Sequence, residues 1–233
     1  MHNSFHIRDR LRAMNELPLV RDRRNAHRAV CADPAARPGE GDVALTGYWD
    51  VLCSVNAGSD ALLRQDALDF LSQLGVNCRA GAPSSIRIEL DASLSERDFI
   101  LEVKPGDIRI AAGGISGAWA GLAWLEFEMG TRRGPFLPSG RVTRRAAWLV
   151  QISQGPWGGN YSVPDFPPEF LSDDSFRLYA HDGVNSMMIY GDMLCYAQST
   201  ILPELNHPES HRHLAILQDA ARRAARYGVR FSY

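Results

Sequence analysis

Three short runs in which apolar and polar side chains alternate constrain the fold of this chain most strongly. In the first run, residues 84–91, Arg87 and Glu89 stand between apolar neighbours. A period of two places alternate side chains on opposite faces of a β-strand, so each run predicts a half-buried strand. The second and third runs are joined by Pro105-Gly106-Asp107, which predicts a tight hairpin because proline presets φ and glycine adopts positive φ. The apolar positions of the three runs are Ile86, Ile88, Leu90, Phe99, Leu101, Val103, Ile108, Ile110 and Ala112.

Two segments with helical spacing of apolar residues flank these strands. Residues 60–74 and 115–129 each place their apolar side chains on one helical face. Gly75 directly follows the first segment, where a left-handed residue commonly ends a helix. The order helix, strand, hairpin, helix predicts an α+β unit, an antiparallel sheet covered on one face by helices.

Beyond Pro138 the pattern changes to mostly apolar runs separated by amphipathic segments. Strands are predicted at residues 147–152, 186–190 and from Val229 onward, with helices at 173–181 and 208–227. Strands this apolar are typical of sheets buried on both faces, so the strand–helix–strand order predicts parallel βα units.

Composition excludes several classes of protein. A net charge of −2 gives no general attraction to nucleic acid or to an anionic membrane. The four cysteines form no CxxC pair, so we expect neither a zinc site nor a disulfide framework, and we expect no cofactor. The N-terminus lacks the apolar core of a secretory signal, and no apolar run approaches the roughly 18 residues of a membrane span. We therefore expect a cytoplasmic protein, while its oligomeric state stays open.

Two parts of the chain together resemble a known enzyme family. The segment RDFILEVKPGDIRIAAGGISGAWAGLAWLEFEM, with Gly117, Gly121, Leu122 and Leu125 at motif positions, is similar to the second domain of family 20 glycoside hydrolases, the β-N-acetylhexosaminidases. AHDGVNSMMIYGD and AARYGVRFSY resemble the second and third strands of the (β/α)8 barrel that follows it. The resemblance implies an N-terminal helical and linker segment (1–45), a hexosaminidase domain-2-like α+β domain (46–141) and an incomplete TIM barrel with strands 1–3 (142–233).

One departure from family 20 concerns the sugar. In that family an Asp-x-Ser-Arg-His sequence follows the first barrel strand, and its arginine holds the hydroxyls of the sugar. Gln151-Ile152-Ser153-Gln154 stands at that place here. The departure implies a glycoside other than a hexosaminide as the substrate.

The catalytic residues cannot be assigned from this sequence. A (β/α)8 barrel needs roughly 250 residues, and in family 20 the acidic pair follows the fourth strand, beyond Tyr233. We therefore expect the N-terminal part of a glycoside hydrolase, a fragment inactive by itself. The alternative is a non-catalytic carbohydrate-binding or interaction protein with a degenerate barrel.

Candidate sugar-binding residues follow from the rule that barrel enzymes bind substrates at the carboxyl ends of their strands. The rule selects Ser153, Gln154, Tyr190 and Asp192, with Trp157 on the loop after the first strand. A carboxylate such as Asp192 accepts hydrogen bonds from two hydroxyls, and Trp157 can stack on a pyranose ring. The purely structural alternatives are that Asp192 caps a turn, Trp157 closes the barrel rim and Tyr190 belongs to the core.

Overall fold

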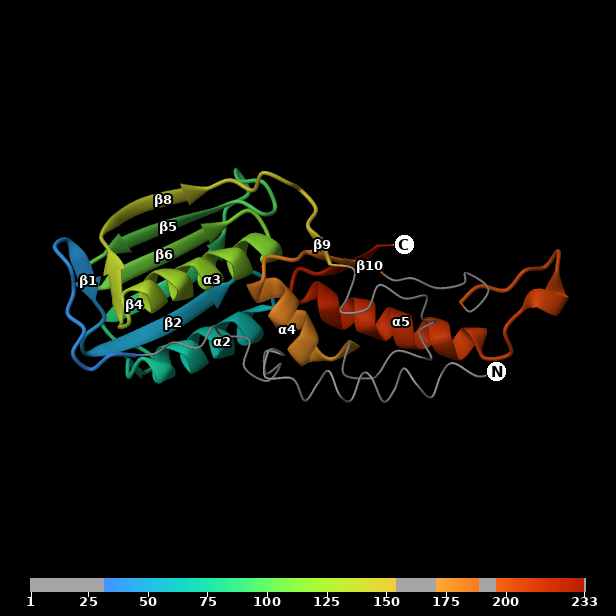
Figure 1. Cartoon of the computed structure of the whole chain (residues 1–233), viewed down its shortest axis with the longest axis horizontal. Coiled ribbons are helices and arrows are strands. Elements are labelled where there is room, and N and C mark those ends of the chain that lie inside the picture. The colour runs from blue at the N-terminus through green and yellow to red at the C-terminus, as the bar shows by residue number, and fades with distance from the viewer. Residues whose placement is uncertain (1–31, 154–170, 189–195, 233) are drawn as a thin grey trace.

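The computed structural model describes residues 32–153, 171–188 and 196–232. In this part of the chain a six-stranded sheet, a three-stranded sheet and a two-stranded ribbon are accompanied by helices (Figure 1). The elements are β1 (Asp42–Ala44), β2 (Tyr48–Ser54), α2 (Asp60–Gln73), β3 (Asn77–Cys78), β4 (Ser84–Leu90), β5 (Phe99–Lys104), β6 (Asp107–Ala112), α3 (Ile115–Thr131), β7 (Phe136–Pro138), β8 (Gly140–Arg144), β9 (Ile152–Ser153), α4 (Asp173–His181), β10 (Ser186–Met188), η4 (Pro203–Leu205), α5 (Ser210–Ala225) and β11 (Arg230–Ser232).

The six-stranded sheet has the order β3-β2-β4-β6-β5-β8 and is mixed. β5 pairs antiparallel with β6 and β8, which confirms the predicted hairpin. β4, however, pairs parallel with both β2 and β6. The prediction of a purely antiparallel sheet is therefore wrong, and the described part of the chain is a mixed α+β fold.

Connection length explains this strand order. The turn at Pro105-Gly106, with Gly106 at φ 76°, is so short that β5 and β6 must be neighbours. The longer loop 91–98 can cross the roughly 10 Å to the strand position beyond the nearest one. The loop 91–98 leaves one strand position free between β4 and β5, and β6 fills it. Because the chain reverses direction before β5 and again before β6, β6 lies parallel to β4.

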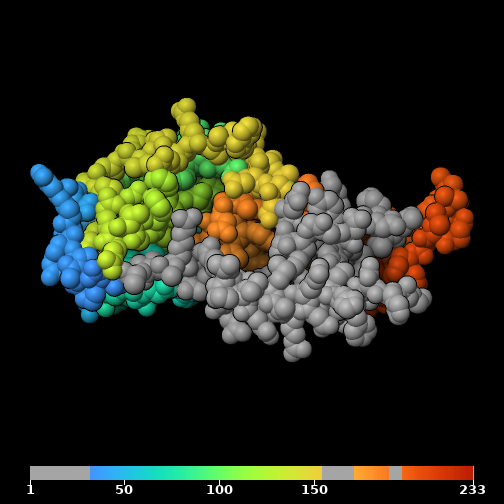
Figure 2. Space-filling model, viewed as in Figure 1, coloured from blue at the N-terminus to red at the C-terminus, as the bar shows by residue number. Residues whose placement is uncertain are grey.

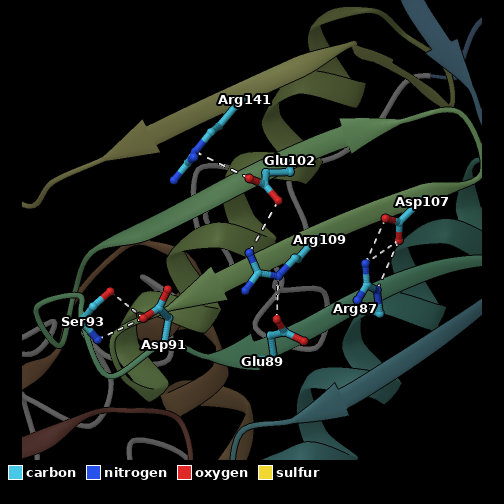
Figure 3. Close-up of polar contacts among 8 residues, drawn as sticks. All are labelled: Arg87, Glu89, Asp91, Ser93, Glu102, Asp107, Arg109 and Arg141. Carbon is cyan, nitrogen blue, oxygen red and sulfur yellow. Dashed lines mark hydrogen bonds and ion pairs between the residues drawn. The ribbon is translucent and has the colours of Figure 1, made fainter.

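The two faces of this sheet differ as the alternation predicts. α2 and α3 pack side by side against one face, where Ile86, Ile88, Ile108 and Ile110 are buried (Figure 1). The opposite face carries ion pairs across neighbouring strands (Figure 3). They join Arg109 to Glu89 and Glu102 at 2.5 and 3.5 Å, Arg141 to Glu102 at 3.6 Å, and Arg87 to Asp107 at 2.9 Å.

Two glycines let α3 approach the sheet closely. A Cβ atom on Gly121 would lie 2.5 Å from Ile110 Cγ2, and one on Gly117 would lie 2.6 Å from the carbonyl oxygen of Asp98. Both contacts are far shorter than van der Waals distance, so these positions need hydrogen instead of a methyl group. This packing explains physically why the glycine spacing of the family-like motif occurs on this helix.

A three-stranded sheet of order β11-β10-β9 follows, and both of its strand pairs are parallel. The predicted parallel units at β10 and β11 are confirmed, with α4 ending at His181 and α5 preceding β11. The predicted strand at 147–152 is wrong over most of its length, because only Ile152–Ser153 is a strand and Trp148 to Val150 are exposed.

Side chains bind the carbonyl oxygens of Trp148 and Leu149, and β10 reaches the backbone only from Gln151 onward, where the N–H of Ser186 donates to the carbonyl of Gln151 at 3.2 Å. Arg97 donates to the carbonyl oxygen of Trp148 at 2.6 Å, and Asn185 Nδ2 donates to that of Leu149 at 2.9 Å. Asn185 Oδ1 in turn accepts from the backbone N–H of Gln151 at 2.7 Å. These bonds replace the ladder that the apolar sequence predicts.

The two sheets share one continuous core of buried apolar residues. Polar contacts join the same units, since Ser116 Oγ donates to the carbonyl of Gly228 and Ser59 Oγ to that of Arg226, both at 2.8 Å. The space-filling view shows α4 (orange) lying directly against α3 (yellow-green) (Figure 2). Among the described helices, none is both long and apolar enough to cross a lipid bilayer.

We predict that Gly121→Ala and Gly130→Ala change stability in opposite directions. The added methyl group at Gly121 overpacks the sheet contact, and the net loss after the gain in helix propensity should be about 1–2 kcal/mol. Gly130 lies on the same helix with nothing within 4 Å of its Cβ position, so alanine there should stabilise by up to about 1 kcal/mol. Urea unfolding of both variants checks this, and equal stabilisation by both would contradict the close approach.

Candidate functional site

The carboxyl ends of the parallel strands lie at one edge of the three-stranded sheet. The register pairs Met187 with Ser153 and Phe231, and Met188 with Ser232. The hydroxyls of Ser186 and Ser232 lie 2.6 Å apart, and Ser186 is buried. In barrel proteins of parallel βα units this edge is where substrates bind, so it is called the strand mouth below.

Four of the predicted sugar-binding residues directly follow or closely follow these strands in sequence. Gln154, Trp157, Tyr190 and Asp192 all lie outside the described residues. Their roles therefore stay predictions. Of the strand-end positions, Ser153 is described, and it ends β9 at the strand mouth.

A buried ion cluster, missed by the sequence analysis, lies where three helices meet. His181 Nε2 of α4 is 2.7 Å from Asp66 Oδ2 of α2, and His181 Nδ1 is 3.4 Å from Glu126 Oε2 of α3. Arg177 Nε, one turn earlier on α4, is 3.6 Å from Asp66 Oδ1. The side chains of Asp66, Glu126 and His181 are at most 5% exposed.

The sequence held a signal for this cluster. Asp66 lies between Leu63 and Phe70 on the apolar stripe of α2, and Glu126 lies between Leu122 and Met129 on that of α3. A carboxylate on a stripe that faces the core needs a partner, because burying an unpaired charge costs several kcal/mol. Such residues predict a buried polar contact, although not which side chain supplies it.

Among the described residues, this cluster brings two cationic side chains to two carboxylates. Burial alone would lower the pKa of His181, but hydrogen bonds and charge attraction from Asp66 and Glu126 outweigh it and raise that pKa to about 9. The imidazolium with Arg177 thus faces two carboxylates. The Trp119 ring packs edge-on to the imidazole at 5.6 Å between centroids.

The cluster has the residue types of a metal site, since one ligand atom from each of Asp66, Glu126 and His181 lies within 4.8 Å of the others. Bonds of 2.0–2.2 Å to a tetrahedral metal would hold neighbouring ligand atoms about 3.3 Å or more apart. His181 Nε2 and Asp66 Oδ2 are closer, at 2.7 Å, and the two carboxylates contact different ring nitrogens. The geometry fits a hydrogen-bonded ion cluster instead.

A groove of about 410 Å³ lies beside the cluster, between α3, the end of β8 and the end of α4. The guanidinium of Arg144 lies 3.8 Å from the centroid of the Trp124 ring, and Trp124 packs against Phe127 at 5.5 Å. The groove is lined by Phe99, Ala120, Ala123, Trp124, Glu126, Phe127, Arg144, His181, Asp182 and Gly183.

Solved glycoside hydrolases share this fold over most of the chain. The chain matches a GH138 enzyme targeting pectin rhamnogalacturonan II with a TM-score of 0.60 and 13% identity, over 79% of this chain and 24% of that one. It matches CpGH84D with a TM-score of 0.57 and 14% identity, over 88% and 36% of the two chains. It also matches the GH20 β-N-acetylhexosaminidase from Streptomyces coelicolor A3(2), with a TM-score of 0.53 and 12% identity, over 88% and 45%. No family model matches the chain, and no curated protein matches its sequence.

These likenesses define a glycoside-hydrolase-like fold that is not specific to family 20. The chain spans between 24% and 45% of the length of these three structures.

We predict that the buried cluster makes stability fall as pH rises. His181 has a raised pKa in the folded chain, so its contribution is complete below about pH 6.5, its unfolded value, and is lost as pH rises through about 9. The loss is on the order of 3 kcal/mol. Urea unfolding at pH 6 and pH 9.5 should show it in the wild type.

The matched variant for this prediction is His181→Gln, which keeps a polar side chain that does not titrate. It should unfold more easily at pH 6, yet its stability should fall less between pH 6 and pH 9.5 than that of the wild type. Glu126→Gln is the milder variant. It should lower the pH at which half of the His181 contribution to stability is lost. An unchanged pH dependence in both variants would contradict a charged His181.

Proposed function

We propose that this chain is the N-terminal part of a carbohydrate-active glycoside hydrolase. In this proposal residues 46–141 form the hexosaminidase-like α+β domain, and residues 142–233 supply the first three strands of a (β/α)8 barrel. One observation carries the proposal: a mixed sheet under α2 and α3 is followed by parallel βα units, in a fold shared with glycoside hydrolases at TM-scores of 0.53 to 0.60.

The strand mouth is the proposed place for the sugar. There Asp192 would accept hydrogen bonds from two hydroxyls, Trp157 and Tyr190 would contact the apolar face of the ring, and Gln154 would donate and accept. Gln154 stands where family 20 has an arginine, so the proposed substrate is a glycoside or oligosaccharide other than a hexosaminide.

Hydrolysis needs more than this mouth provides in the described residues. A glycosidase uses two carboxylates that flank the scissile bond, about 5–9.5 Å apart. The described strand ends carry Ser153, Met188 and Ser232. In the proposal the catalytic carboxylates come from polypeptide beyond residue 233.

The same serines favour a second function, carbohydrate binding without hydrolysis. Hydroxyl groups at the strand mouth can exchange hydrogen bonds with a sugar but do not act as the acid and nucleophile of a glycosidase. A hydrolase and a carbohydrate-binding protein would use the same strand mouth, but only the hydrolase would cleave the bound saccharide.

We predict that the 233-residue chain binds saccharides and does not hydrolyse them. Incubation with a panel of aryl glycosides should release no more phenol than a heat-inactivated control. Turnover above that control would show that the catalytic carboxylates lie within this chain.

We also predict that Asp192→Asn lowers saccharide affinity by roughly ten- to a hundredfold, because hydrogen bonds to a carboxylate contribute about 1.5–3 kcal/mol. The matched control is Asp174→Asn, an exposed aspartate in the first turn of α4, which should bind as the wild type does. Calorimetric titration with the saccharide that binds best measures both. Unchanged affinity with a lower melting temperature would instead identify Asp192 as a turn cap.

A further inference from the structure

α3 is apolar on more sides than the sheet can cover. Trp119, Leu122 and Met129 are buried against the core, while a second stripe of the helix consists of Ala120, Ala123, Trp124 and Phe127. A helix that is apolar all round is normally covered all round. Here the second stripe forms the floor of the groove, and Phe127 is 41% exposed.

The groove lies on the opposite side of the parallel strands from the strand mouth. Its lining residues His181 to Gly183 come just before β10, at the amino end of that strand. Substrates of barrel enzymes bind at the carboxyl ends. A ligand in the groove would therefore occupy a second site, separate from the proposed catalytic one.

The aromatic part of the groove offers a surface on which a ligand can pack. Arg144 covers one face of Trp124 and so fixes the ring beside Phe127, with 41° between the two ring planes. The indole N–H of Trp124 is buried and has no acceptor among the described residues. Its resonance therefore reports how the ring packs, while the aromatic surface open to a ligand is that of Phe127, which is 41% exposed.

The charges around the groove balance. Arg144 and Asp182 are exposed and place one guanidinium and one carboxylate on the lining, whereas Glu126 and His181 are at most 5% exposed and are paired in the ion cluster. A ligand of either net charge would therefore meet repulsion as well as attraction. A neutral pyranose suits this lining, because its hydroxyls exchange hydrogen bonds with both signs of charge and its C–H face packs on the negative π-face of an aromatic ring.

From these observations we propose that the groove between α3, β8 and α4 is a second, non-catalytic binding site for a neutral pyranose ring. Its volume of about 410 Å³ lies within the range of small-ligand pockets. The choice of a sugar as ligand rests on the proposed function, whereas the position and neutrality of the ligand rest on the lining residues.

The test is a ¹H–¹⁵N NMR titration of the 233-residue chain that follows the indole resonance of Trp124. Methyl β-glucopyranoside and methyl β-galactopyranoside are the neutral probes, and glucuronate and glucosamine are the charged ones. At least one neutral probe should shift the resonance saturably, and the charged probes should bind at least tenfold more weakly. The highest probe concentration is about 50 mM, on the order of the weakest useful dissociation constants. If no neutral probe shifts the Trp124 resonance at that concentration, the proposal is overturned.

Variants locate the bound sugar. Phe127→Ala removes the aromatic surface and Ala123→Gln fills the groove, and each should weaken the Trp124 response at least tenfold while the melting curve shows a folded chain. Leu205→Ala, which removes an exposed leucine in η4, is the control and should leave the response unchanged.

The two proposals fail in different ways. Sugar binding that Asp192→Asn abolishes and Phe127→Ala does not would overturn the groove site and support the strand mouth. Binding that Phe127→Ala abolishes and Asp192→Asn leaves intact would support the groove and count against the strand mouth. Concentration-dependent broadening of the Trp124 resonance without sugar would show that a second copy of the chain covers the groove, and would overturn the proposal.

Discussion

The contact of His181 with Asp66 and Glu126 joins the two halves of this structure. It draws one side chain from each of α2, α3 and α4 to a single buried point, with distances of 2.7 and 3.4 Å. α4 leads through Gly183 directly into β10, the central strand of the parallel sheet. The cluster therefore helps to set the orientation of the strand mouth relative to the mixed sheet, together with the hydrogen bonds of Ser116 to Gly228 and Ser59 to Arg226.

Charge has different consequences in the two places where the structure concentrates it. On the open face of the mixed sheet, ion pairs such as Arg87–Asp107 are partly exposed, and pairs of this kind contribute about 0–1 kcal/mol each. In the buried cluster each charge has lost its hydration, so removal of one partner costs about 3–5 kcal/mol. The exposed pairs therefore contribute little to stability, whereas the buried cluster fixes how the helices meet.

α3 contacts the mixed sheet with one side and the ion cluster and the groove with the other. Its glycine-containing side lies so close to the sheet that Gly121 has no room for a methyl group. Its other side carries Glu126 to the ion cluster and Trp124 and Phe127 to the groove. The parallel strands thus have the strand mouth at one end and an aromatic groove at the other.

Elements whose signals are local could be predicted from the amino-acid sequence alone. Alternation at Ile86 and Ile88, the turn at Pro105-Gly106 and the helical spacing around Leu63 and Trp119 each depend on neighbours within one element, and all were confirmed. The parallel pairing of β4 with β6 could not be predicted in this way, because a loop such as 91–98 permits more than one strand position and packing selects among them. Likewise, Asp66, Glu126 and His181 lie far apart in the chain, and a carboxylate on an apolar stripe predicts a partner without naming it. The sequence sets the direction of each side chain along its own helix or strand, but which distant side chains meet is decided by how those elements pack.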